Sequence, residues 1–501
     1  MRSGNVEAET GEGGGVEDVA VDIGALDLQK APNGEVDDDG RPKRTGFAVE
    51  SLIRNESIGT MWTASAHIIT AVIGSGVLSL AWCTAQLGYV AGPASILTFS
   101  LVTFYTSTLL TDCYRSPDPV TGKRNHSYME AVRSNLGGTM HMFCGMAQYF
   151  NIVGISIGYN ITASMSLVAI QRLHCFHKRG RDASCTTSHN IFMITYGIVQ
   201  MILSQIPNIH ELSWLSTIAA VMSFSYSIIG VVLSASKIFS GDTGKATLGG
   251  VEVGPNLTES QKVWQTFTAL GNIAFAYTYS VILIEIQDTI RAPAENKEMR
   301  KASVVGVTTT TLFYILCGSV GYAAFGNNAP GNLLTWFYKP LWLIDFANIC
   351  IVVHLVGAFQ VFCQPLFSAV ETWASRRSNM SKTMRTDYAV KIGKKFKYNI
   401  NLFRLVWRTI FVALATILAM AMPFFNDILG LLGALGYWPL TVYFPVQMYV
   451  TQKQIGRFTY RWMGLQVLNI CCFLVALCAA SGAIHGMNKA LRKAKPFKGS
   501  L

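Results

Sequence analysis

The sequence has 501 residues, of which 50% are hydrophobic and only 14% are charged. Apolar runs of 18 or more residues recur along the chain, so the composition excludes a soluble globular protein and predicts a helical membrane protein. The net charge of +11 would suit a nucleic-acid binder, but basic residues also collect in the cytosolic loops of membrane proteins, and we expect no nucleic-acid partner.

The first 55 residues differ from the rest of the chain. Residues 1–40 hold 11 of the 29 acidic residues and too little apolar surface to fold, so we expect a disordered cytosolic tail. A basic patch follows at 41–44, either as the positive flank of the first span or as a contact for anionic lipid. We expect no cleavable signal peptide, because the tail is acidic and polar.

Eleven apolar runs are long enough to cross a bilayer as helices. A short amphipathic stretch at 128–136 is expected to lie along the membrane surface before the third run. The expected spans are residues 62–88, 92–114, 141–171, 190–207, 211–239, 264–291, 301–325, 341–373, 403–422, 426–450 and 461–487. We assign 56–450 to a ten-helix transport core and 451–501 to an eleventh helix with a C-terminal tail.

Counts of Lys and Arg in alternate connections predict the orientation. With the N-terminus inside, the inner connections carry 24 basic residues and the outer ones 8, although five more in the C-terminal tail argue weakly the other way. We therefore expect a cytosolic N-terminus and an extracellular C-terminus. Asn256 then lies in an outer glycosylation sequon, and Cys175 and Cys185 lie in an outer loop, where a disulfide is permitted although their spacing alone leaves it open.

The first span contains Gly74, Ser75 and Gly76 near its middle. Glycine loosens a helix, and a break at membrane depth is tolerated where it lines a cavity. A second half-helix that starts near Gly76 would direct free N–H groups and a positive dipole end at that cavity, which suits a carboxylate. The alternative is a close helix–helix contact through small residues.

The sixth span also has small and polar residues near its middle, at Gly271 and Asn272. Spans one and six occupy matching places if the first ten spans form two five-helix repeats, and paired interruptions of this kind indicate the binding site of an inverted-repeat transporter. N–H donors on one wall and carbonyls on the other would suit a zwitterion, so amino acids are the leading substrate class.

Motifs for other chemistry are absent from the sequence. It contains neither a Walker A loop nor an HExxH or GxSxG motif, so we expect no enzyme activity, no metal and no cofactor. The remaining energy source is an ion gradient.

Ionisable residues within spans are costly and usually face a cavity. His67 and His354 are candidate proton carriers, although each could equally be a neutral imidazole bonded to a carbonyl. Glu285 is a candidate proton site or inner-gate partner for a loop arginine. Asp112, Asp288 and Arg408 lie near span ends and can reach the interface.

Three stretches resemble the plant amino acid permeases of the amino acid/auxin permease family, within the APC superfamily. They are HIITAVIGSGVLSLAW (67–82), IAFAYTYSVILIEIQDT (273–289) and HLVGAFQVFCQP (354–365), and the similarity covers about residues 55–487. The resemblance implies an all-α polytopic membrane protein with a LeuT-like 5+5 inverted repeat plus an eleventh helix, with helices 1 and 6 broken. It also implies proton-coupled amino acid symport at the plasma membrane by alternating access. The oligomeric state is left open.

The resemblance also implies roles for particular residues. Ile73, Gly74, Ser75 and Gly76 would hold the substrate carboxylate, with Thr70 beside them. Gly271, Asn272, Ala274 and Phe275 would hold the amino group and cap the pocket, and Asn151 in span three would shape it. Sodium-coupled members of the fold bind sodium between spans one and eight, and we hypothesise that protonation at His67 and His354 replaces it. An auxin or other organic-acid carrier, a non-transporting amino acid sensor and a membrane enzyme are the alternatives.

Overall fold

The computed structural model describes residues 60–119, 121–180, 185, 187–206, 213–255, 257–291, 294–375, 387–392, 396–422 and 424–493. The expected acidic tail, its basic patch and Asn256 lie outside the described residues. Those that are described fall within the unit formed by residues 46–501.

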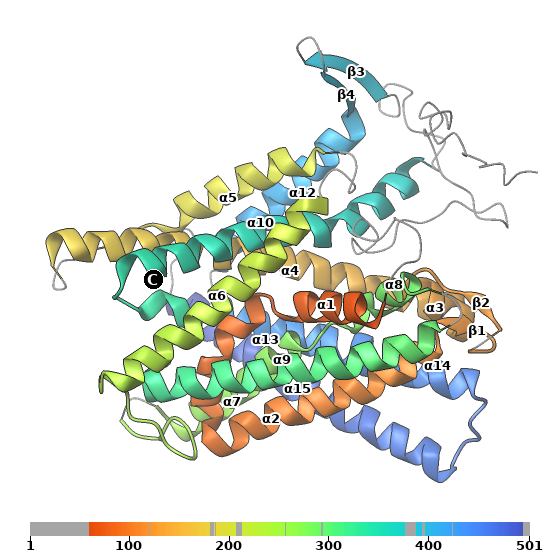
Figure 1. Ribbon diagram of the computed structural model, residues 1–501, viewed down its shortest axis with the longest axis horizontal. Coiled ribbons are helices and arrows are strands. Elements are labelled where there is room, and N and C mark those ends of the chain that lie inside the picture. Colours follow the sequence, from red (N-terminus) through yellow and green to blue (C-terminus); the bar gives the residue numbers. More distant parts are fainter. Residues whose placement is uncertain are drawn as a thin grey trace, which may run out of the picture. The chain divides into compact units, whose positions relative to one another are not determined.

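The first expected span is built from three pieces (Figure 1). α1 (Met61–Val72) begins at Thr60, whose side chain accepts a hydrogen bond from the Thr63 amide. A 3-10 turn, η2 (Ser75–Ser79), leads into α2 (Leu80–Asp112). Gly88 interrupts α2 with a φ of 84°, a conformation that a side chain disfavours. α2 therefore contains the end of span one and all of span two, joined at this glycine.

The next segments follow the expected order. A hairpin of β1 (Arg115–Ser116) and β2 (Lys123–Arg124) precedes α3 (Tyr128–Leu136), which coincides with the expected amphipathic stretch. Three helices follow, α4 (Gly138–Arg179), α5 (His189–Ser204) and α6 (Ser213–Phe239). A disulfide joins Cys175 to Cys185 between α4 and α5, which settles the pairing that the spacing left open.

The second half of the chain begins with another interrupted helix. It consists of α7 (Glu259–Ala276), η4 (Ser280–Ile282) and α8 (Leu283–Asp288). The remaining elements are α9 (Glu295–Phe325), η5 (Gly326–Asn328), η6 (Leu333–Trp336), α10 (Leu341–Ser375), β3 (Asp387–Ile392), β4 (Phe396–Asn401), α12 (Leu402–Ala421), α13 (Phe425–Gly436), the π-helical turn η7 (Tyr437–Tyr443), α14 (Phe444–Gln452) and α15 (Tyr460–Lys493).

The helices have the length and surface of membrane spans. Among the described residues, nine helical segments are long and apolar enough to cross a membrane, and α5 is a shorter apolar helix. Because one of the nine, Ser75–Asp112, supplies parts of two spans, each of the eleven expected spans corresponds to a helix. Large apolar side chains such as Leu101, Ile202 and Leu312 are about two-thirds exposed (65–66%), as lipid-facing positions require.

The connections between helices fall into two groups. Gln452 donates a hydrogen bond to the carbonyl of Arg115, and Arg115 forms an ion pair with Glu295. All three residues lie in or next to connections that the charge counts assign to the cytosolic side. We call this end the inner side. At the other end, here called the outer side, the Asn327 backbone amide donates a hydrogen bond to the Lys245 backbone carbonyl. A Cβ on Gly88 would lie 2.2 Å from the Leu248 carbonyl oxygen. The helices therefore run between two distinct ends.

Candidate functional site

The first interruption lies between α1 and η2. The Gly74 amide turns back to the Val72 carbonyl at 2.9 Å, so the helical bond pattern stops there. η2 then begins at Ser75 without a side-chain cap. The first N–H groups of a helix lack intrahelical partners, and they carry the positive end of its dipole. This half of the site therefore offers donors to an anionic group.

The second interruption does not lie where the sequence analysis placed it. α7 continues through Gly271 and Asn272 and ends at Ala276. Gly271 instead permits close packing, because a Cβ there would lie 2.4 Å from the Gly430 carbonyl oxygen. The chain leaves the helix at 277–279, where the Thr278 hydroxyl donates to the Ala274 carbonyl and the Tyr279 amide donates to Tyr277. Such local bonds compete with helix continuation.

Tyr314 of α9 joins the two interruptions. Its hydroxyl is hydrogen-bonded to the Val72 carbonyl and lies 3.1 Å from the Ala276 carbonyl. In uninterrupted helices these carbonyls would accept the amides of Gly76 and Ser280. One buried side chain thus replaces the missing helical partner at both ends, and a Cβ on Gly76 would lie only 3.1 Å from the Ala276 Cα.

A cavity of about 60 Å³ lies between the interrupted helices, α4 and α10. This volume is several times the roughly 10–15 Å³ that one water molecule needs. Its lining consists of Ala71, Val72, Gly74, Ser75, Gly76, Gln148, Asn151, Ile152, Ile155, Tyr159, Phe275, Ala276, Thr278, Tyr279, Val281 and Phe362. We call this the central cavity.

Among the residues that the structure describes, the lining combines polar groups with an apolar wall and contains no charged side chain. Within the described part of the chain, the buried Oδ1 of Asn151 has no hydrogen-bond partner, so it can accept a bond from a ligand. The aliphatic and aromatic lining comes from α4 and α10, through Ile152, Ile155 and Phe362. The cavity can therefore bind a net-neutral solute that has a donor, an acceptor and an apolar portion.

The structure brings together part of the expected substrate site. Gly74, Ser75, Gly76, Asn151 and Phe275 line the central cavity. The other expected substrate residues lie outside that lining, namely Thr70, Ile73, Gly271, Asn272 and Ala274. For the three residues on α7 the reason is the later interruption, which moves the open end of the helix to Phe275–Tyr279.

The sequence analysis missed most of the lining from α4. Gln148, Asn151, Ile152, Ile155 and Tyr159 line the central cavity. Their spacing of three, four, seven and eleven residues is that of one helix face. Two amides on one face of an otherwise apolar span are a signal that could have identified this wall.

The candidate proton-coupling residues lie at different places. His354 is buried at the first interruption, where a Cβ on Gly74 would lie 3.9 Å from its Nε2. Its Nδ1 lies 2.8 Å from the Ala219 carbonyl, and Nε2 has no hydrogen-bond partner among the described residues. His67 lies further back on α1 and is half-buried. Glu285 lies on α8, where its Oε1 accepts the Tyr128 amide at 3.1 Å. This contact stabilises the N-terminus of α3.

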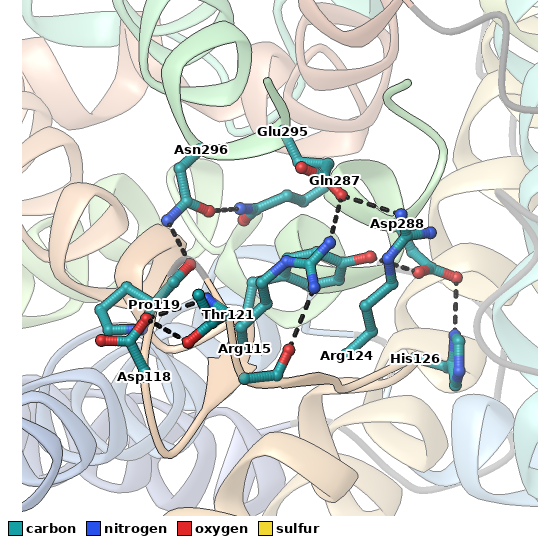
Figure 2. A network of polar contacts seen from close by, with 12 residues as sticks. Arg115, Asp118, Pro119, Thr121, Arg124, His126, Gln287, Asp288, Glu295 and Asn296 are labelled. Atoms are coloured by element: carbon teal, nitrogen blue, oxygen red, sulfur yellow. Dashed lines mark hydrogen bonds and ion pairs between the residues drawn. The ribbon is translucent and has the colours of Figure 1, made fainter. Parts of the chain in front are cut away.

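A polar network lies on the inner side beyond α8 (Figure 2). The buried Glu295 carboxylate contacts Arg115 at 2.7 Å and Arg124 at 3.0 Å. Asp288 contacts the His126 imidazole at 3.0 Å. These contacts fasten the connection between α2 and α3 to the connection between α8 and α9. The Asp288 carboxylate bonded to His126 raises the pKa of this imidazole, against the opposing effect of burial.

The chain is similar to known proteins over most of its length. Residues 57–488 match the family described as transmembrane amino acid transporter protein. Amino acid permease 6 of Arabidopsis thaliana is 56% identical over 93% of this chain and 95% of its own length. Amino acid permease 1 of the same plant is 54% identical over 93% and 94%.

More distant relatives share less of the sequence. Lysine histidine transporter-like 1 of Arabidopsis thaliana is 28% identical over 87% of this chain and 89% of its own length. A solved sodium-coupled sialic acid symporter is 12% identical, with a TM-score of 0.45 over 90% of this chain and 93% of that one. The match over residues 57–488 and the close permease relatives decide the assignment. The chain belongs to the family of transmembrane amino acid transporter proteins, which are membrane carriers rather than enzymes.

Proposed function

We propose that this transporter imports amino acids across the plasma membrane by proton-coupled symport, with alternating access to the central cavity. The observation that carries the proposal is the uncharged lining between two interrupted helices. Free N–H groups at the start of η2 would receive the substrate carboxylate. Asn151 Oδ1 would receive the ammonium group, and the apolar wall would receive the side chain. A carboxylate without an ammonium group would leave that acceptor unpaired, at a cost in affinity.

Alternating access needs barriers that open in turn on the two sides of the site. The contacts of Glu295 with Arg115 and of Asp288 with His126 would form the inner barrier. Opening it would require the α2–α3 connection to separate from the α8–α9 connection. Because the bonds are side-chain contacts between connections, they can be broken without unfolding a span.

Proton coupling is proposed at His354. Its Nε2 adjoins Gly74 and has no hydrogen-bond partner in the described part of the chain, so a proton there would add positive charge beside the carboxylate site. His67 and Glu285 are the secondary candidates. Each proton that crosses 100 mV of membrane potential supplies about 2.3 kcal/mol, which corresponds to roughly fiftyfold accumulation of a neutral amino acid.

Uptake of labelled amino acids into proteoliposomes, with pH and sodium varied independently, tests the proposal. We expect uptake to follow the proton gradient and to ignore sodium. The His67→Ala, His354→Ala double variant should lose most of its pH dependence. Sodium-dependent uptake that ignores pH would refute proton coupling.

Two glycine variants test the site itself. Gly74→Val should abolish uptake, because its side chain would occupy the cavity. Gly74→Ala is the matched control and should retain substantial uptake, since its Cβ meets only ordinary van der Waals contact at 3.9 Å. Indole acetate that competes as well as amino acids would indicate an organic-acid carrier, and binding without flux would indicate a sensor.

A further inference from the structure

A second cavity, of about 300 Å³, lies on the outer side between α7, α13 and α15. These three helices pack against one another in the structure (Figure 1). We call it the outer cavity. Its lining includes Trp264, Thr268, Asn426, Asp427, His485 and Lys489. Unlike the central cavity, it contains side chains of both charges.

Asp427 and Lys489 face this cavity without pairing. Within the described residues, no ion pair or hydrogen bond of either side chain is formed. Asp427 lies in the first turn of α13, where the helix dipole favours a carboxylate. Its carboxylate lies directly against α15, because a Cβ on Gly486 would be 2.1 Å from Oδ1 and 3.0 Å from Oδ2. The glycine therefore leaves the space that the carboxylate occupies.

Amide and aromatic groups also line the outer cavity. Asn426 presents a buried Oδ1 that has no partner in the described chain, and the His485 ring stacks on Trp264 at 4.8 Å. Trp and Lys near the end of a span commonly anchor it at the membrane interface. That role does not explain an unpaired carboxylate held against a helix backbone, or an unpartnered amide beside it.

The outer cavity lies along α7 from the central cavity. Thr268 lines the outer cavity and Phe275 lines the central one. They are two helical turns apart, so their side chains lie on the same side of α7. Between them Gly271 contacts Gly430, where a Cβ would lie 2.4 Å from the carbonyl oxygen. A ligand in the outer cavity would thus lie outside this glycine contact.

We propose that the outer cavity is a second ligand site, for a zwitterion whose ammonium group binds Asp427 and whose anionic group binds Lys489. A free amino acid and the headgroup of an aminophospholipid share this chemistry. The site goes beyond the proposed function, on which it rests only for the choice of an amino acid as probe. It uses none of the residues that line the central cavity.

Equilibrium binding of radiolabelled alanine to the full-length protein, in nanodiscs of phosphatidylglycerol alone, tests the free amino acid. We expect two equivalents for the unmodified protein, and one equivalent for Asp427→Asn, for Lys489→Met and for Gly74→Val. Gly486→Ala should weaken the outer site at least tenfold while keeping every charge, because it displaces the carboxylate. Asp345→Asn is the matched control, since Asp345 pairs with His174 and does not line the outer cavity, and it should keep two equivalents.

Mass spectrometry of protein purified from membranes that contain phosphatidylethanolamine tests the lipid. Retained phosphatidylethanolamine that is lost in Asp427→Asn and Lys489→Met, but kept in Asp345→Asn, supports the site with a lipid as its ligand. The proposal would be overturned if the outer cavity bound neither alanine nor phosphatidylethanolamine. It would also be overturned if the Asp427, Lys489 and Gly486 variants left the binding of both ligands unchanged. Loss of one alanine equivalent in Gly74→Val alone, with no phosphatidylethanolamine retained by the purified protein, would overturn the outer site while leaving the central site intact. Loss of one alanine equivalent in Asp427→Asn and Lys489→Met, but not in Gly74→Val, would support the outer site and overturn the central site.

Discussion

The hydroxyl oxygen of Tyr314 lies 3.1 Å from the carbonyl oxygen of Ala276, at the residue where α7 ends. The same hydroxyl is bonded to Val72, where α1 ends. The Ala276 carbonyl needs such a partner, since an unpaired buried carbonyl costs about 1–3 kcal/mol, whereas the Val72 carbonyl also accepts the Gly74 amide. Tyr314 therefore stabilises both interruptions, and its contacts link α9 to the central cavity.

Tyr314→Phe should lower amino acid uptake by roughly 5- to 150-fold, as the loss of 1–3 kcal/mol implies. The ring remains, so the packing of α9 is kept and the protein should still fold. Initial rates of uptake, normalised to the amount of protein in the membrane, measure the effect.

Tyr322→Phe is the control on the same helix. Its hydroxyl bonds Thr247 and Asn327 at the outer side, away from the interruptions. It should lower thermal stability while leaving uptake close to normal. Equal losses of uptake in the two variants would contradict a specific role for Tyr314.

Asn151→Ala should raise KM about 10- to 100-fold, because a hydrogen bond to a charged group contributes about 1.5–3 kcal/mol and Asn151 Oδ1 is the proposed partner of the ammonium group. Asn160→Ala is the control within α4. Its Nδ2 bonds Thr416, and it does not line the central cavity. An unchanged KM in Asn151→Ala would remove this residue from the site.

Glu295→Gln should favour opening of the inner side. Glu295 is 3% exposed, whereas Arg115 and Arg124 are 17% and 34% exposed, so solvent screening reduces the loss to roughly 1–3 kcal/mol. A cysteine placed at Val281, which lines the central cavity, reports the change. Its labelling from the inner side by a membrane-impermeant maleimide should rise roughly 5- to 100-fold.

Glu298→Gln provides the comparison for this experiment. Glu298 pairs with Lys301 one turn along the same helix, at 2.9 Å, and not across the two connections. It should leave the labelling rate unchanged. Faster labelling in both variants would indicate a general effect of lost charge on α9.

The inner network should also respond to pH through His126. Its partner Asp288 raises the imidazole pKa, with Glu130 acting in the same direction and Arg124 opposing. The stabilisation is then fully present below about pH 6.5, the ordinary value, and is lost as the pH rises through the raised pKa. We expect inner-side labelling of the Val281 cysteine, after division by the intrinsic pH-dependent reactivity of a thiol, to increase as the pH rises above about 6.5, and this corrected dependence to be lost in His126→Gln. The same pH profile in both proteins would exclude His126 as the titrating group.

The sequence predicted the elements whose signals are local. The amphipathic stretch at 128–136 became α3 with the same bounds, because its pattern and the Ser127 cap lie within a few residues. The two mid-span glycines show where such reasoning stops. Gly74 lies at an interruption, whereas Gly271 lies inside a continuous helix against Gly430.

A glycine within a span can permit either a break or a close approach. The choice depends on the helix that packs against it, and for Gly271 that helix lies about 160 residues further along the chain. The second interruption depends likewise on Tyr314, whose hydroxyl satisfies the Ala276 carbonyl from another span. No pattern within span six could have shown this bond.

The uncharged lining of the central cavity has a consequence for electrical recordings. A zwitterion carries no net charge, and the lining supplies none to cancel. If protons are the coupling ion, as proposed, the current that accompanies transport of a neutral amino acid would consist of protons alone. The ratio of charge to labelled solute would then equal the proton stoichiometry. Lysine or glutamate would find no counter-ion in the cavity. Each should therefore be transported poorly, or with a different number of protons per substrate, which the ratio of charge to labelled solute would reveal.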